Sequence, residues 1–136
     1  MREERNDVSD APQSQDDDAA AADYDDNEPG AVSLFITRFK KVVEARLEDS
    51  DVSVEDLASD MNLSRVQLYR KVKAVTGSSP VELLRTARLN RAYQLLLTTD
   101  KSVSEVAYAV GFAAPSYFTK CFKEEYGFLP GDVKKN

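Results

Sequence analysis

Apolar residues recur every three or four positions along the chain from residue 33 onward. This spacing places them on one face of an α-helix. No segment alternates between apolar and polar residues with a period of two, so the pattern predicts an all-α fold. The first stretch predicts an amphipathic helix of about four turns, whose apolar positions are Leu34, Phe35, Phe39, Val42, Val43 and Leu47.

Helix start and stop signals divide the remainder of the chain. A Ser followed three residues later by Asp, Glu or Gln can form a capping box, and this spacing occurs at Ser53, Ser64, Ser79 and Ser102. Pro80 and Pro115 suit the first position of a helix, whereas Gly77 and Gly127 suit the position after its end. Together these signals predict a series of helices, including a long one over about 80–97.

The chain also contains an internal repeat. Ser53, Val54, Asp56 and Ala58 match Ser102, Val103, Glu105 and Ala107; Arg70, Val72, Lys73, Gly77 and Pro80 match Lys120, Phe122, Lys123, Gly127 and Pro130. Each copy reads as a short helix, a turn and a longer helix, which is the helix-turn-helix arrangement. We expect Ala58 and Ala107 where the paired helices cross, and left-handed backbone at Asn62 and Gly111. The first unit spans about 53–77 and the second about 102–127, with the helix over about 80–97 between them.

The longer helix of each unit has two distinct faces. Leu68, Val72 and Val75 form an apolar stripe in the first, and Phe118, Cys121, Phe122 and Tyr126 do so in the second. On another side, the first helix carries Val66, Tyr69, Arg70 and Lys73, and the second carries Ser116, Thr119, Lys120 and Lys123. Such a stripe suits the DNA major groove. There Arg and Lys reach guanine or phosphate, Ser and Thr bond either, and Val packs on a thymine methyl group.

The charge is unevenly distributed along the 136 residues, whose net charge is −6. Residues 1–30 contain eleven acids and two arginines, a balance of −9, whereas residues 31–136 contain thirteen acids and sixteen bases, a balance of +3. The acidic part has few large apolar residues, so we expect residues 1–30 to be a disordered linker before a folded domain over 31–132. An alternative is an acidic arm that competes with nucleic acid for the basic face.

The composition argues against several kinds of chemistry. The chain has no His and a single Cys, so we expect no zinc site, no internal disulfide, no other metal and no cofactor. It lacks a Gly-rich phosphate loop and any recognisable pair of nucleophile and base, so we do not expect an enzyme. With no signal peptide and no long apolar run, we expect a cytoplasmic protein without membrane contact.

Two stretches closely resemble the AraC family of transcription regulators: "LASDMNLSRVQLYRKVKAVTGSSPVELLRTARLNRAYQLLLTTD" and "SVSEVAYAVGFAAPSYFTKCFKEEYGFLPGD". The resemblance implies a seven-helix domain whose two recognition helices read adjacent major-groove segments of double-stranded DNA. By the family pattern, the base-reading positions are Val66, Gln67, Tyr69 and Arg70 in the first helix and Pro115, Ser116, Thr119 and Lys120 in the second. We expect Arg65, Lys73 and Lys123 to contact DNA as well.

A narrower resemblance concerns "MNLSRVQLYRKVKAVTG" preceded by an acidic linker. It is similar to the carboxy-terminal output domain of hybrid two-component regulators of Bacteroides-type bacteria, which control polysaccharide-use genes. The likeness implies upstream sensing, kinase and receiver modules, so we expect this chain to be a fragment of a longer protein. RNA polymerase is a further candidate partner, and we expect any homodimerisation to occur through the upstream modules.

Several positions have a second, purely structural interpretation. Gln67 can either cap its own helix or contact a base, and the ring of Tyr69 can either pack on the domain or contact DNA. We expect Lys71 to be solvated, Cys121 to be a small buried hydrophobe, and Tyr117, Phe118, Phe122 and Phe128 to belong to the core. Of Arg85, Arg88 and Arg91, we expect one to bond neighbouring backbone and the others to be solvated. The alternative function is a helical protein-interaction module, which would need an exposed apolar groove.

Overall fold

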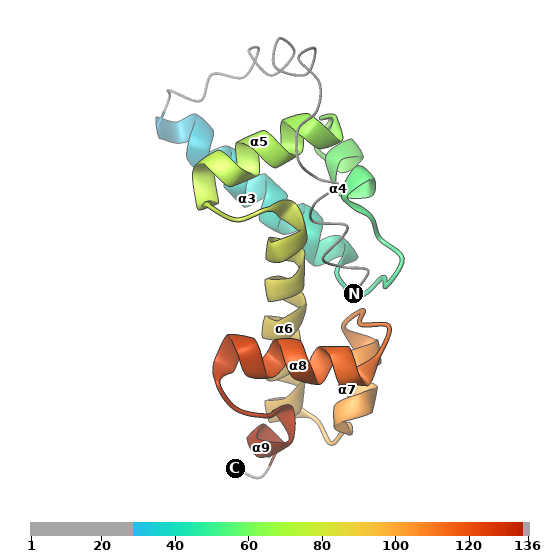
Figure 1. Cartoon of the computed structure of the whole chain (residues 1–136). Helices are drawn as coiled ribbons and strands as arrows, with labels where there is room; N and C mark the ends of the chain where they lie inside the picture. The colour runs from blue at the N-terminus through green and yellow to red at the C-terminus, as the bar shows by residue number, and fades with distance from the viewer. Residues whose placement is uncertain (1–28, 135–136) are drawn as a thin grey trace. The chain divides into compact units, whose positions relative to one another are not determined.

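The computed structural model describes residues 29–134, which form seven α-helices and, within that range, no β-strand (Figure 1). The helices are α3 (Pro29–Arg46), α4 (Val54–Asp60), α5 (Arg65–Thr76), α6 (Pro80–Thr98), α7 (Val103–Ala109), α8 (Pro115–Tyr126) and α9 (Pro130–Lys134). The predicted all-α fold with about seven helices is therefore confirmed. The prediction of disorder for the acidic segment concerns residues that lie, except for its last two, outside the described range.

The predicted helix starts are formed by side-chain caps. Ser53, Ser64, Ser79 and Ser102 each accept a hydrogen bond from the backbone N–H three residues on, at 3.1–3.2 Å. The side chain at that third position accepts a bond from the backbone N–H of the serine in return, at 2.8–3.0 Å. These reciprocal bonds satisfy N–H groups that a helix start leaves without partners. Helix α8 differs, because Ala114 precedes it and provides no side-chain cap.

The described helices divide between two compact units. The first contains most of α3, α4, α5 and the start of α6. Its core includes Phe35, Phe39, Leu57, Leu68 and Val72, each at most 2% exposed. Burial of these large apolar side chains is the main stabilising contribution, at about 1.5–3 kcal/mol each.

Two predicted apolar positions of this unit are not in its core. Leu34 is 64% exposed, because Phe35 and Phe39 define the inward row of α3 and Leu34 lies about 100° around the helix from Phe35. Val75 is 37% exposed, because it lies in the last turn of α5, directly before the left-handed Gly77 that ends the helix. The predictions for these two residues are therefore wrong.

The second unit contains residues 45–52, α6 from Leu84, and α7, α8 and α9. Its core is rich in aromatic rings: the Phe118 ring lies 5.2 Å from Phe112 and 5.7 Å from Phe122. Cys121 is buried at 5% exposure, as predicted. Phe128 contacts Phe122 with a ring separation of 6.0 Å but is 37% exposed, so it covers the edge of the core rather than lying inside it.

The two helix-turn-helix turns share one backbone geometry. The backbone N–H of Leu63 bonds to the carbonyl of Ala58 at 2.9 Å, and Phe112 bonds to Ala107 at 3.0 Å. Asn62 has φ 61° and Gly111 has φ 98°, so the predicted left-handed residues are confirmed. Ala58 and Ala107 are 2% and 0% exposed, as expected where paired helices cross. Among the described residues, no helix is both long enough and apolar enough to span a membrane.

Candidate nucleic-acid interface

Four of the predicted contact residues of α5 lie on its solvent-facing side. Arg70 and Lys73 are exposed, and Val66 and Tyr69 are half-buried beside them. Leu68 and Val72, on the other side of the helix, are completely buried. The apolar face therefore fixes the rotation of α5 and leaves a ridge of two cations, one aromatic ring and one small apolar side chain for a ligand.

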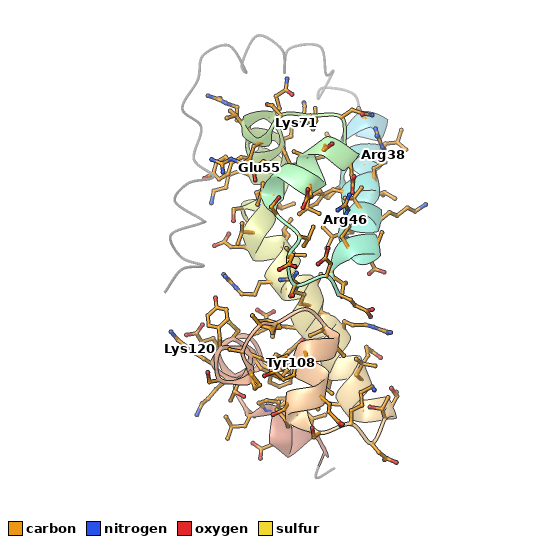
Figure 2. The ribbon with its side chains drawn as sticks, turned by 90° about the vertical axis from the view of Figure 1, so that its right-hand side faces the viewer. Arg38, Arg46, Glu55, Lys71, Tyr108 and Lys120 are labelled. Carbon is orange, nitrogen blue, oxygen red and sulfur yellow. The ribbon has the colours of Figure 1, made fainter. Side chains whose placement is uncertain are left out.

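Helix α8 presents the same arrangement in its own unit. Ser116, Lys120 and Lys123 are exposed, and Pro115 and Thr119 are half-buried. Phe118 and Phe122 are completely buried on the opposite face. Figure 2 shows Lys120 on the outer side of this helix. We call residues 66, 69, 70 and 73 the first stripe, and residues 116, 119, 120 and 123 the second stripe.

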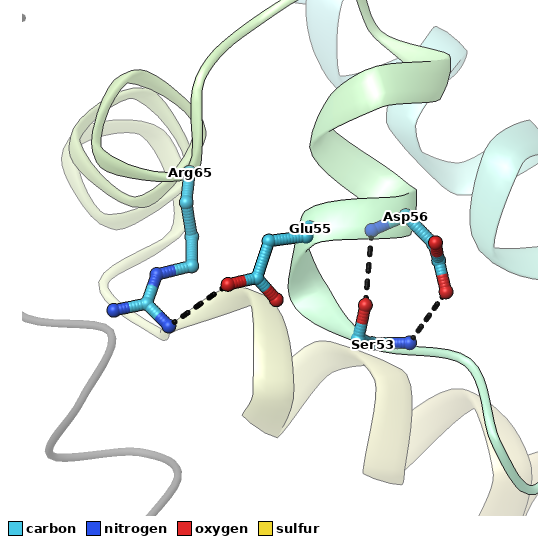
Figure 3. Close-up of polar contacts among 4 residues, drawn as sticks. All are labelled: Ser53, Glu55, Asp56 and Arg65. Atoms are coloured by element: carbon cyan, nitrogen blue, oxygen red, sulfur yellow. Dashed lines mark hydrogen bonds and ion pairs between the residues drawn. The ribbon is translucent and has the colours of Figure 1, made fainter.

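Two predicted contact residues at the start of α5 are engaged in local interactions. Gln67 is only 8% exposed, and its Oε1 accepts a hydrogen bond from the Ser64 backbone N–H at 2.8 Å. The capping interpretation of Gln67 is therefore observed. Arg65 forms an ion pair with Glu55 of α4, with Nη1 3.3 Å from Oε2 (Figure 3). Both residues help to fix the start of the first recognition helix, α5.

Lys71 is not solvated as predicted: it is buried, with 5% of its surface exposed. Its position explains why, since Lys71 directly precedes the buried Val72 and lies three residues, about 300°, beyond the buried Leu68. The aliphatic part of a lysine side chain can cover apolar surface while its ammonium group stays near the helix edge. Lys71 therefore belongs to the supporting face of α5, not to the ligand-facing stripe.

The three arginines of α6 each have a partner in the second unit. Arg88 donates to the carbonyls of Leu47 and Asp49, both at 2.7 Å, which confirms that one of the three bonds neighbouring backbone. Arg85 donates to the Tyr117 hydroxyl at 3.4 Å, and Arg91 pairs with Glu48 at 3.6 Å. The expectation that the other two are only solvated is wrong, because side chains opposite α6 lie within their reach.

Burial affects the pKa of two weakly acidic side chains in the second unit. Burial raises the pKa of the Cys121 thiol, and this outweighs the opposing effect of its hydrogen bond with Tyr117. Burial, with the nearby Glu125 carboxylate, also raises the pKa of Tyr126, whose hydroxyl donates to Asn90. A buried thiol with a raised pKa is a poor nucleophile, so Cys121 acts as a packing residue.

A helix-turn-helix domain family matches residues 57–136, which is more than half of the chain. Similar solved structures include an AraC-type transcriptional regulator from Chromobacterium violaceum, with 29% identity over 78% of this chain and 94% of that one and a TM-score of 0.72. The DNA-binding domain of AdpA, solved with a target DNA, is 33% identical over 72% of this chain and 90% of that one, with a TM-score of 0.65. The chain belongs to the AraC-type helix-turn-helix family of DNA-binding transcription regulators.

A histidine kinase and a response regulator are also among the similar sequences and structures. The histidine kinase P4 of Formosa agariphila is 37% identical over 94 residues, which are 69% of this chain and 7% of the kinase. The carboxy-terminal domain of AraT, a response regulator from Geobacillus stearothermophilus, is 31% identical over 74% of this chain and 84% of that domain, with a TM-score of 0.68. The chain spans about a third or less of the length of the curated relatives it matches.

Proposed function

We propose that residues 31–132 form a sequence-specific DNA-binding domain that places α5 and α8 in adjacent major-groove segments. The observation that supports this best is the repeated surface of these helices. Each presents a solvent-facing stripe with two basic residues opposite a buried and mainly apolar face, at positions 50 residues apart. An α-helix fits the major groove, where such side chains meet base edges and phosphates.

The chemistry of each side chain suggests its role in the first stripe. Arg70 carries a planar guanidinium that can bond both acceptors of a guanine, whereas Lys73, one turn farther along, suits a phosphate. Val66 can pack on a thymine methyl group, and Tyr69 can reach a phosphate or a base. Gln67 retains only its amide N–H donors for DNA, because its oxygen caps the helix. We assign Arg65 to a phosphate, for which it would leave its ion pair with Glu55.

The second stripe has weaker means of discrimination. Lys120 and Lys123 are point charges without the fork of Arg, and Ser116 and Thr119 bond either bases or phosphates. Pro115 contributes no backbone donor at the start of α8, and Ala114 before it provides no cap. We assign this helix mainly to anchoring, with a looser base preference than α5.

We further propose that the domain is the output module of a two-component signalling protein. The similarity to the Formosa kinase and to the AraT response-regulator domain supports this assignment. The acidic residues 1–30 would then act as a linker from upstream modules, through which any dimerisation would occur, in a cytoplasmic protein. Control of carbohydrate-use genes, and contact with RNA polymerase, follow from the family resemblance alone.

A salt titration of duplex binding tests the proposed function. Neutralised phosphates release counterions, so the logarithm of the affinity should fall linearly with the logarithm of salt concentration, by about 0.9 per phosphate contact. The matched variant is Lys40→Ala with Lys41→Ala, which removes two exposed cations from α3, outside both stripes. It should leave the slope unchanged, whereas Lys73→Ala with Lys123→Ala should reduce it by about two. Equal effects of the two double variants, or no duplex binding, would contradict the proposal.

A further inference from the structure

A junction within the second unit joins three segments that are distant in sequence. These are the residues just beyond α3, the middle of α6, and the turn between α7 and α8. Arg88 of α6 donates its Nε to the Leu47 carbonyl and its Nη2 to the Asp49 carbonyl, both at 2.7 Å. Leu47 and Asp49 follow Arg46, the last residue of α3, and the Asp49 carbonyl also accepts the Val52 backbone N–H at 3.2 Å. Arg88 therefore holds the chain where it leaves α3, near the partial negative charge of the helix end.

Gly111 in the α7–α8 turn lies directly against this pair. A Cβ atom at position 111 would collide with the Leu47 carbonyl oxygen and lie 2.8 Å from Arg88 Nε. Gly111 also has a φ of 98°, which side chains rarely tolerate. The turn thus lies so close to the Arg88–Leu47 hydrogen bond that a side chain at position 111 has no room, and the turn packs directly on the bonded pair.

The α7–α8 turn also fixes the start of α8. Phe112 follows Gly111, donates its backbone N–H to Ala107 at 3.0 Å, and is 5% exposed. Its ring meets the Phe118 ring of α8 edge to face, with centroids 5.2 Å apart. Phe118 is completely buried and lies between the stripe residues 116 and 119 along the helix. A shift of the turn would therefore move the first turns of α8 and the side chains that they present.

We propose that Arg88 is a positioning residue for DNA reading by α8, acting through the Leu47 carbonyl and the Gly111 turn without touching DNA itself. Burial lowers the pKa of Arg88, partly offset by Asp49, and an arginine stays protonated at neutral pH. The acceptors Leu47 and Asp49 precede the matched helix-turn-helix family region, which begins at residue 57. The segment over 45–52 therefore helps to position the α7–α8 turn of the second unit and does not only connect two helices.

The chain offers a matched control for Arg88. Arg91 lies one turn farther along α6 and also reaches the segment after α3, through an ion pair with Glu48 at 3.6 Å. Its side chain is 49% exposed, and exposed pairs contribute little. Arg91→Ala thus removes a cation and a contact with the same segment without disturbing the backbone bonds or the Gly111 turn.

Amide hydrogen exchange without DNA gives the first test. In Arg88→Ala the amides of Phe112 and Phe118 should exchange about tenfold faster or more, because two charged hydrogen bonds are lost. The amides of Leu68 and Val72 in the first unit should change less than about twofold, and Arg91→Ala should change neither set. Arg88→Lys keeps the charge but loses the forked guanidinium, so it should show an intermediate effect. It replaces Arg88→Ala in this test if the alanine variant does not fold. Unchanged exchange at Phe112 and Phe118, or equal acceleration in both units, would overturn the inference.

The second test rests on the proposed function and uses two duplexes selected by the wild-type protein. One carries the full site, and the other keeps only the half bound by α5, with the remainder randomised. Arg88→Ala should reduce affinity for the full site about tenfold, towards that for the half site, and leave half-site affinity within about twofold. Equal losses on both duplexes would overturn the positioning role. A wild-type protein that selects no duplex would contradict the proposed function instead, and the exchange test would still decide the inference.

Discussion

Lys71 in α5 and Cys121 in α8 occupy equivalent positions in the two repeated helices, and each is buried with 5% of its surface exposed. The repeat offset of 50 residues aligns them, as it aligns Leu68 with Phe118 and Val72 with Phe122. The same position thus lies on the buried, supporting face of both helices. It is occupied by a small thiol in α8 and by a lysine side chain in α5. Backbone geometry and not side-chain polarity decides which residues face the ligand.

The burial of Lys71 leads to a stability prediction. Lys71→Ala should lower the free energy of unfolding by about 1–2 kcal/mol, because the packing of its aliphatic stem is lost. The control is Lys73→Ala, which removes the same side chain from an exposed position two residues away and should change stability by less than about 0.5 kcal/mol. Denaturant unfolding followed by circular dichroism measures both. Equal stabilities for the two variants would show that Lys71 contributes no packing.

Much of this fold was predictable, because its signals are local. The capping serines, the prolines at helix starts and the turn residues Asn62 and Gly111 each act within a few residues, and all were found in the expected places. The repeat aligns Lys71 with the apolar-side residue Cys121, so it also indicated that Lys71 is buried. The charge of Lys71 favoured the opposite, incorrect prediction. The errors at Leu34 and Val75 arose because periodicity defines a face only to within about one residue.

The roles of the α6 arginines could not be derived from sequence. Their spacing indicated that they lie near one another on the helix, but the choice among them depends on where the chain after α3 runs. Arg88 meets two backbone carbonyls there, whereas Arg85 meets a hydroxyl and Arg91 a carboxylate. Such contacts between residues some 40 positions apart have no local sequence signal. The DNA contacts of the two stripes likewise remain predictions.

Arg70 should provide sequence discrimination. Arg70→Ala should weaken binding to the selected site by about 1–3 kcal/mol and relax the preference at one base position, because a bidentate contact with guanine is lost. Competition binding against duplexes substituted at each position in turn measures both effects. If the variant loses equal affinity for the selected site and for random DNA, Arg70 contacts a phosphate instead.

Lys123 should contribute affinity without discrimination. It lies in the last turn of α8, where an exposed lysine meets the DNA backbone more readily than the bases. Lys123→Ala should therefore weaken binding to all duplexes by a similar factor and reduce the salt slope by about one. A salt titration on selected and random duplexes provides the comparison, and an altered base preference would assign Lys123 to a base.

The acidic segment should oppose DNA binding by electrostatic repulsion. Removing residues 1–28, which carry eleven acids and two arginines, should raise affinity at low salt, because a balance of −9 is no longer tethered to the domain. The gain should shrink as salt increases, since exposed charges beyond about 10 Å are largely screened at 0.1 M. A charge-neutral segment of equal length, with Asn and Gln for the acids and Gln for the two arginines, is the control and should match the deletion. Lower affinity after deletion would mean that the segment contributes contacts with DNA.

We propose that the two repeated helices read two adjacent halves of one DNA site, with unequal strictness. The most direct measurement is a selection of random duplexes by residues 31–136, followed by footprinting and a base-by-base substitution scan. We predict a strict half under α5 and a looser half under α8, about one helical turn or 10 bp away. The variants Ser64→Cys and Ala114→Cys place a thiol next to each helix start. Hydroxyl-radical cleavage of the DNA by an iron chelate attached to that thiol would assign each half of the site to its helix. A site whose strictest bases all lie under α8, or a selection that yields no preferred sequence, would contradict the account.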